Sequence, residues 1–223
     1  MFEINNITMI YDMEKTEKVY ALRGFDLTLP DKGLVGIIGP SGSGKSTLMY
    51  CLSTLKRATD GKILYNGKNL TELRESERER LRREEFGFVF QRHFLVPYMS
   101  ALDNVTVAAV KFNQETKERG KELLASLRIG EKEFGRRPAK LSGGQRQRTA
   151  IARAMINQPK VLFADEPTAA LDHENAFVVM DILKEYSSEN LVLVITHDHS
   201  ILRDADRVIE MWDGDLSRKE EAL

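Results

Sequence analysis

The feature that most constrains this chain lies at residues 34–47, where an apolar run leads directly into a glycine-rich loop. The apolar residues 34–38 predict a buried strand, and a helix is predicted to begin at about Ser46. The loop between them fits G-x-x-x-x-G-K-[ST] in the strand–loop–helix context that this motif requires. Glycines leave backbone N–H groups free to surround phosphate oxygens, and the helix adds its positive N-terminal end. The stretch therefore predicts a nucleoside triphosphate site.

Each residue of this loop is a candidate phosphate or metal contact. We expect Lys45 to reach the β- and γ-phosphates and the Ser46 hydroxyl to ligate Mg²⁺. A plain glycine turn with a surface lysine is the alternative, and the flanking strand and helix argue against it. The predicted contacts are Gly39, Pro40, Ser41, Gly42, Ser43, Gly44, Lys45, Ser46 and Thr47.

A second predicted strand, at residues 161–165, ends in two neighbouring acids, Asp165 and Glu166. Ligand sites in open α/β sheets lie at the carboxyl ends of strands. Asp165 is therefore expected to hold Mg²⁺ through water. Glu166 would point to the other side of the strand and polarise an attacking water as general base. The alternative is a pair of exposed acids at a strand end.

A further cradle for an anion is predicted at Ser142, Gly143, Gly144 and Gln145, which open a strongly helical segment at 145–157. Their backbone N–H groups would be exposed at a helix N-terminus. By itself the segment could be an ordinary Ser-Gly-Gly cap. However, two cradles with only one set of acids make sense if the second cradle completes the site of another subunit.

Size and composition limit the partners of the chain. With 223 residues it can form one large domain or two closely joined lobes, and its net charge of −1 creates no global field favouring nucleic acid or an anionic membrane. The single Cys51 excludes an internal disulfide and fits a reducing cytoplasm. No signal peptide or run of ~20 apolar residues is visible. We expect a soluble protein whose membrane role, if any, comes through a partner.

The order of predicted elements indicates an α/β fold. Two half-buried strands, at 2–10 and 19–29, are joined by a polar turn at 12–18. Alternation of strands and helices then predicts a parallel sheet covered on both faces. Residues 92–158 predict an inserted, mostly helical lobe, and the tail after residue 216 is expected to fray. Further strands are predicted at 62–65, 86–90, 105–110, 161–165, 191–196 and 207–212, and helices at 72–85 (charged and solvated), 115–127, 145–157, 173–186 and 198–205.

Together these motifs resemble an ATP-binding-cassette ATPase in order and spacing over nearly the whole chain. The matching segments are 39–47, Gln91, 141–145, 162–166, Leu171–Asp172 and His197. The resemblance implies a P-loop (RecA-like) core with an N-terminal antiparallel β subdomain, formed by residues 1–91 and 159–223, and an inserted signature lobe at 92–158. It also implies a head-to-tail dimer, in which each ATP lies between the phosphate loop of one subunit and the segment 141–145 of the other.

The resemblance implies roles for further residues. Gln91 is similar to the glutamine that contacts Mg²⁺ and reports ATP binding to the partner, and His197 to the switch histidine on the γ-phosphate. Asp172 would belong to the loop that communicates between the two sites. Tyr11 resembles the aromatic residue that stacks on adenine. Tyr20 is a competing candidate for this role, and Tyr11 could instead be a core tyrosine at the end of a strand. The remaining histidines match no family position and are expected at the surface: His93, His173 and His199.

Finer features at 86–92, 95–97 and 103–105 resemble the ATPases of lipoprotein-release and macrolide-export systems. This implies an integral-membrane permease as partner and a position on the cytoplasmic side of the membrane. The stretch at 110–117 is short for this subfamily. A non-transporting complex in signalling or cell division remains an alternative, as does a soluble cassette ATPase, although the latter usually carries a coiled-coil insertion or two cassettes. No basic stripe favours nucleic acid, and no guanine motif favours a GTPase.

Overall fold

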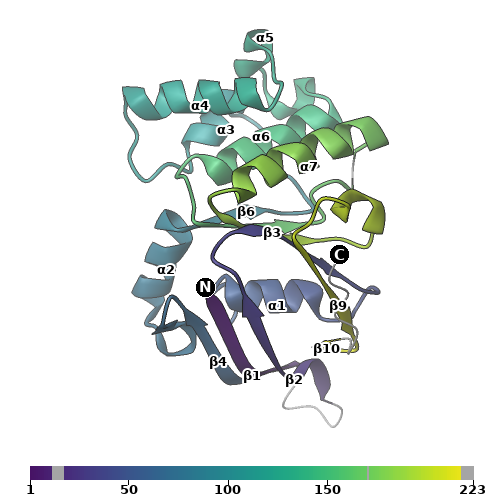
Figure 1. Ribbon diagram of the computed structural model, residues 1–223. Coiled ribbons are helices and arrows are strands. Elements are labelled where there is room, and N and C mark those ends of the chain that lie inside the picture. The colour runs from purple at the N-terminus through teal and green to yellow at the C-terminus, as the bar shows by residue number, and fades with distance from the viewer. Residues whose placement is uncertain (12–17, 170, 217–223) are drawn as a thin grey trace.

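The computed structural model describes residues 1–11, 18–169 and 171–216. Within these ranges, six strands form a sheet through the middle of the molecule in the order β10-β9-β3-β8-β7-β6 (Figure 1). All neighbours in this sheet are parallel except β9 and β10. The strands are β3 (Gly33–Ile38), β6 (Phe86–Val89), β7 (Val161–Asp165), β8 (Leu191–Ile195), β9 (Arg207–Trp212) and β10 (Asp215–Leu216).

A smaller antiparallel sheet lies below it, in the order β2-β1-β4-β5, with α1 (Lys45–Leu52) between the two sheets (Figure 1). Alternating apolar residues give β1 and β2 one buried face each. Leu48 and Leu52 of α1 share a buried cluster with Ile4 of β1 and Phe163 of β7. The helix is therefore held in place from both sides. The strands are β1 (Phe2–Tyr11), β2 (Val19–Leu29), β4 (Asp60–Tyr65) and β5 (Lys68–Asn69).

Helices cover the opposite face of the central sheet. A second buried cluster there joins Leu162 of β7 and Val192 of β8 with Ile151 of α6 and Val179 of α7. Strands β7 and β8 are buried on both faces, and their sequences are accordingly nearly continuous apolar runs. The remaining helices are α2 (Glu75–Glu84), α3 (Ala101–Thr106), α4 (Gln114–Ser126), α5 (Glu131–Phe134), α6 (Gly143–Met155) and α7 (His173–Ser187), with 3-10 turns η1 (Leu70–Glu72), η2 (Pro138–Lys140) and η3 (His199–Leu202).

The topology confirms the predicted α/β class, with a parallel core sheet, an antiparallel N-terminal sheet and helices inserted after β6. Strand β8 lies between β3 and β7. Because these strands are parallel, the segments that follow β3, β6, β7 and β8 all emerge at one edge of the sheet. No helix in the described ranges is both long and apolar enough to cross a membrane.

Three local predictions were wrong. The strand predicted at 105–110 is absent there, because Ser100 and Asp103 form a capping box that opens α3 and includes Val105 in that helix. The helix predicted at 198–205 is only the short turn η3. Helix α2 is not fully solvated, since Arg78 is 6% exposed and donates to the backbone oxygen of Thr54 just beyond α1.

Two further expectations cannot be compared with the structure. The polar turn predicted at 12–18 lies outside the described residues except for Lys18, and the tail at 217–223 lies wholly outside them.

Candidate functional site

The phosphate loop requires glycine at two positions. Helix α1 begins at Lys45 with Gly44 as its cap, at φ +96°. A Cβ on Gly44 would lie 2.3 Å from the backbone oxygen of Ala21, and one on Gly39 would lie 2.1 Å from that of Met211. Neither position can accept a side chain without moving backbone. The loop therefore packs closely against β2 and β9.

Lys45 points back into this loop. Its Nζ donates to the backbone oxygens of Gly39 and Pro40, each at 2.8 Å, and the residue is only 8% exposed. Burial lowers the pKa of Lys45, and the nearby carboxylates of Glu166 and Asp165 oppose that shift. The loop thus encloses a largely desolvated cation, which an anionic ligand would stabilise.

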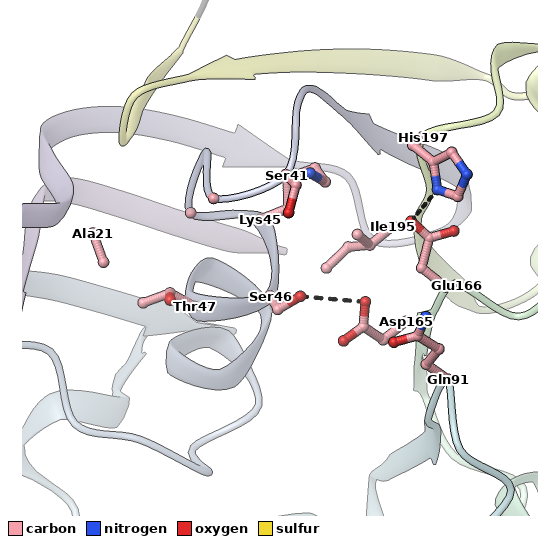
Figure 2. A pocket seen from close by; sticks show the side chains of 12 residues that line it. Ala21, Ser41, Lys45, Ser46, Thr47, Gln91, Asp165, Glu166, Ile195 and His197 are labelled. Atoms are coloured by element: carbon pink, nitrogen blue, oxygen red, sulfur yellow. Dashed lines mark hydrogen bonds and ion pairs between the residues drawn. The ribbon is translucent and has the colours of Figure 1, made fainter. Parts of the chain in front are cut away.

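Opposite the lysine, the end of β7 brings a carboxylate to the start of α1. The Ser46 Oγ donates to Oδ1 of Asp165 at 3.3 Å (Figure 2). Asp165 is 9% exposed, and burial, together with the charge of Glu166, raises the pKa of its carboxyl group, while the bond from Ser46 lowers it. Two hard oxygen donors from distant parts of the sequence therefore meet at the entrance of the loop.

Glu166 lies one residue further, where β7 has ended. Its backbone is left-handed, at φ +50°, and its N–H donates to the backbone oxygen of Ile195 at 2.8 Å. The carboxylate accepts a bond from Thr196 Oγ1 at 3.3 Å and lies 2.8 Å from Nδ1 of His197. Hydrogen bonding to Glu166 is the main cause that raises the pKa of His197. This left-handed turn, rather than the continued strand pleat that we expected, orients the carboxylate.

These groups line one cleft of about 400 Å³ (Figure 2). Gln91, which follows β6, reaches the cleft near Asp165 and Glu166. Sequence reasoning missed two wall residues, Ala21 and Ile195, because their contribution depends on how β2 and β8 approach the loop and no local pattern indicates it. The full lining is Ala21, Ser41, Gly42, Gly44, Lys45, Ser46, Thr47, Gln91, Asp165, Glu166, Ile195 and His197.

The oxygen donors of the cleft suit a metal that is shared with a ligand. The described residues contain no group of three or more His, Cys, Asp or Glu side chains that could hold a metal ion. Mg²⁺ commonly binds through one or two carboxylates together with substrate phosphates and water. Ser46, Asp165 and the amide of Gln91 fit such an ion when a triphosphate occupies the loop.

The two candidate tyrosines differ in their surroundings. The Tyr11 hydroxyl lies 3.5 Å from Thr47 Oγ1 at the end of the loop, and Lys56 Nζ lies 3.0 Å from the same hydroxyl and 4.4 Å from the ring centroid. Tyr20 is 41% exposed, and its ring is 5.6 Å from the guanidinium carbon of Arg23. Tyr11 is thus the tyrosine that contacts the phosphate loop.

The second cradle forms the start of α6. Ser142 Oγ accepts from the Gln145 N–H at 3.2 Å, and the Ser142 N–H donates to Gln145 Oε1 at 2.9 Å. Ser142 is exposed, and none of residues 142–145 lines the cleft. The predicted residue Asp172 caps α7 and accepts from Asn175, which in turn accepts from Arg148 of α6 at 2.6 Å. The starts of α6 and α7 are therefore linked.

The other histidines follow the prediction in part. His173 and His199 are exposed, as expected. The surface assignment of His93 is wrong: this residue is half-buried, and its Nε2 has no hydrogen-bond partner in the described part of the chain. Burial lowers the pKa of His93, and Arg146 and Arg153 lower it further.

Comparison with known proteins identifies the family. A family model described as ABC transporter matches residues 22–169. The chain is 45% identical over 197 residues to the lipoprotein-releasing system ATP-binding protein LolD of Aquifex aeolicus, covering 86% of this chain and 88% of that protein. It is 40% identical over 227 residues to the macrolide export ATP-binding/permease protein MacB of Wolinella succinogenes, covering 100% of this chain and 35% of that protein. The chain thus spans about a third of the macrolide and pyoverdine exporters that it matches.

Solved structures give the same result. The ATP-binding cassette MJ0796 of Methanocaldococcus jannaschii, described as a dimer in a post-hydrolysis state bound to ADP and Pi, has a TM-score of 0.92 and 35% identity. The alignment covers 100% of this chain and 99% of that one. The match extends over both sheets and the helical layer, so the chain belongs to the ABC transporter family and is one of its ATP-binding cassettes.

Proposed function

We propose that this chain is the ATP-hydrolysing subunit of a membrane transporter. It binds Mg-ATP in the cleft, pairs head to tail with a second copy, and drives a separate permease of the lipoprotein-release or macrolide-export type. One observation carries this proposal: a phosphate loop, the oxygen pair of Ser46 and Asp165, and the oriented carboxylate of Glu166 meet in a single cleft.

ATP binding begins at the loop. The backbone N–H groups of residues 41–47 receive the phosphates, and Lys45 exchanges its contacts with the Gly39 and Pro40 oxygens for phosphate oxygens. Tyr11 stacks on the adenine, a role that its contact with Thr47 favours over Tyr20. Ser46, Asp165 and Gln91 hold Mg²⁺, which when bound neutralises negative charge on the phosphate oxygens.

Glu166 supplies the chemistry of hydrolysis. Its carboxylate accepts a proton from the attacking water as the water oxygen bonds to the γ-phosphorus. The bond from the γ-phosphorus to the bridging oxygen breaks, and ADP leaves with the electron pair. Thr196 and His197 hold the carboxylate in place through its two oxygens. His197 is largely exposed, so its ring can also contact the γ-phosphate from the open side of the cleft.

The second cradle acts on the partner's nucleotide. The first N–H groups of α6, including those of Gly143 and Gly144, have no intrahelical acceptor. They lie outside their own cleft, and Ser142 beside them is exposed. Across a head-to-tail pair they bind the γ-phosphate held by the other subunit. Asp172, tied to α6 through Asn175 and Arg148, would carry information between the two sites.

The helical lobe, residues 92–158, provides the contact with the permease, while residues 1–91 and 159–223 form the ATP-binding core. Apolar side chains in the segments that flank α3 are exposed, and contact with the permease would remove them from water. The chain would then lie on the cytoplasmic side of the membrane, held by its permease. A complex that signals instead of transporting would use the same surface. The exposed residues are Phe94 (64%), Tyr98 (72%), Val107 (53%) and Phe112 (74%).

Glu166→Gln tests this proposal. Glutamine keeps the shape of the side chain but cannot accept the proton, so turnover should fall by ~10²–10⁴-fold. ATP binding should be intact or tighter, because a negative charge near the γ-phosphate is removed. On gel filtration the variant should be monomeric without nucleotide and dimeric with Mg-ATP, whereas wild type dimerises only transiently.

An exposed glutamate on α4 provides the control, since Glu122→Gln should change neither property. A Glu166→Gln protein that hydrolyses ATP at the wild-type rate and stays monomeric in excess ATP would contradict the mechanism.

A further inference from the structure

The loop that follows Gln91 is held to α6 by one side chain. Arg153, in the last turn of α6, donates from one terminal nitrogen to the backbone oxygen of Phe94 at 2.6 Å and from the other to that of His93 at 2.7 Å. A guanidinium presents its donors in a rigid fork, which matches two neighbouring oxygen acceptors. Arg153 thus binds two consecutive carbonyl groups of a loop that belongs to the nucleotide cleft.

The conformation of this loop needs such support. Phe94 has a left-handed backbone, at φ +45°, which is unfavourable for a residue with a bulky side chain. Its ring contacts Phe90 edge-on, but the residue remains 64% exposed, so packing alone restrains it weakly. The two bonds from Arg153 therefore restrain the turn itself, while Asn104 holds the backbone of Val96 just beyond it.

The charges around the turn favour the same arrangement. Arg153 is half-buried and, among the described residues, has no ion-pair partner. Its charge is balanced mainly by the carbonyl dipoles that it holds, so the guanidinium and the loop stabilise each other.

Helix α6 connects this contact with the second cradle. The helix packs against β6, begins at the Ser142 cap and reaches Arg153 eleven residues later, a distance of about 16 Å at 1.5 Å per residue (Figure 1). A rigid helix transmits a shift at one end to the other. Movement of Ser142 would therefore displace the loop that carries Gln91.

We propose that Arg153 is a positioning residue, which fixes Gln91 in the nucleotide cleft and makes its loop move with α6. The inference rests on the proposed function, since it takes Gln91 as a contact of Mg-ATP and Ser142 as a contact of the partner's nucleotide. The same clamp holds the backbone of Phe94, whose exposed ring belongs to the proposed permease contact. One arginine thereby links the two nucleotide sites and the docking surface.

Arg153→Lys tests the clamp, because lysine keeps the charge but lacks the fork. We expect kcat to fall by about tenfold, as for residues that orient a metal contact. The KM for ATP should change by less than about twofold, since residues 39–47 keep their contacts. Arg136→Lys is the matched control in the same lobe and should behave as wild type. Arg136 is exposed, and its only ion-pair partner among the described residues is Glu133.

A double-mutant cycle separates positioning from a merely structural role. If Arg153 acts through Gln91, Arg153→Lys should cause no further loss of kcat in a Gln91→Ala background. Losses that multiply would overturn the proposal, as would an unchanged kcat in Arg153→Lys. If Arg153→Lys does not fold, the cycle is repeated with Arg153→Met, which keeps the aliphatic stem and removes every donor.

Hydrogen exchange without nucleotide tests the clamp independently of turnover. The amide of Val96, which donates to Asn104 Oδ1 next to the clamped residues, should exchange at least about tenfold faster in Arg153→Lys, while those of α1 stay unchanged. A wild-type chain without ATPase activity would refute the proposed function. Faster exchange of the loop would then still support the clamp, whereas unchanged exchange would overturn it.

Discussion

Two helices in this protein begin with a cradle of backbone N–H groups, and the two cradles differ in almost every other respect. The start of α1 is walled by β2 and β9, contains the buried Lys45, and faces Asp165. The start of α6 has an exposed serine cap, and its capping box is completed by its own Gln145. In the described part of the chain, no acid of the cleft and no buried lysine lies beside it.

The difference shows that an anion site needs more than a helix N-terminus. Helix dipoles and free N–H groups contribute modestly at an exposed surface, and a buried counter-charge adds much more. We propose that the cradle of α1 binds nucleotide within one chain. That of α6 is half of a site, which we propose is completed by a second subunit.

Removing the counter-charge should have the largest effect. Lys45→Ala should weaken ATP binding and lower turnover by at least ~10²-fold, because the phosphates lose a fixed and desolvated cation. Turnover and binding of a fluorescent ATP analogue measure both effects. Ser142→Ala, the counterpart at the other cradle, should leave nucleotide binding by the monomer unchanged. Normal ATPase activity in a folded Lys45→Ala protein would refute the assignment.

The next largest difference should appear in stability when one glycine of each cradle is replaced by alanine. Gly44→Ala places a Cβ at φ +96° and 2.3 Å from a backbone oxygen, so unfolding should become easier by about 1–3 kcal/mol. A Cβ at Gly144 would lie 3.2 Å from the end of the flexible Arg148 side chain. Gly144→Ala should therefore change stability by less than about 1 kcal/mol. Urea unfolding without nucleotide measures the free energy of unfolding of both variants. Equal losses of stability would contradict the distinction between the two cradles.

A functional carboxylate should reduce the stability of the empty protein. The pKa of Asp165 is raised in the folded state, so its ionisation at neutral pH favours the unfolded chain. This cost is absent in acid and appears as pH rises through the unfolded pKa. At pH 7, Asp165→Asn should stabilise the protein without nucleotide by about 0.5–2 kcal/mol. The variant should be stabilised no more by Mg-ATP than by ATP alone. Thermal melting at pH 7 without nucleotide, with ATP alone and with Mg-ATP measures both effects. A variant that melts below wild type without nucleotide, or that still gains stability when Mg²⁺ is added to ATP, would contradict the prediction.

The smallest expected effect comes from His197, which is largely exposed. Because the pKa of His197 is raised in the folded state, its bond to Glu166 stabilises the fold fully below pH 6.5 and loses that effect as pH rises through the folded pKa. After solvent screening this amounts to a few tenths of a kcal/mol. The melting temperatures of His197→Gln and wild type should differ at pH 5.5 and converge at pH 9. A difference that grows with pH would contradict this prediction.

Much of the fold could be predicted, because long apolar runs and glycine loops are determined locally. The strands that carry the phosphate loop, Asp165 and His197 lie where their sequence patterns indicated. The main failure was Val105, where β-branched residues suggested a strand. The capping signal of Ser100 and Asp103 was the better guide.

Other features depend on contacts between distant segments, which no local pattern reveals. Arg78 is buried only because Thr54 offers its oxygen, and Ala21 matters only because β2 presses against Gly44. The left-handed turn at Glu166 and the clamp from Arg153 to His93 likewise form only in the assembled fold. Sequence motifs thus predicted most of the residues that line the cleft, whereas their orientation required the structure.

Mixing two inactive variants tests most directly the claim that each hydrolysis site combines the α1 cradle of one subunit with the α6 cradle of the other. Ser142→Arg should bind ATP through its own loop but hydrolyse none, and Lys45→Ala should be inactive alone. In a mixed pair, both lesions fall on one site and leave the other intact. Equal mixing should restore up to about a quarter of wild-type activity, since half of the pairs are mixed and each has one working site. A mixture as inactive as its components, or a Ser142→Arg protein that hydrolyses ATP alone, would contradict the account.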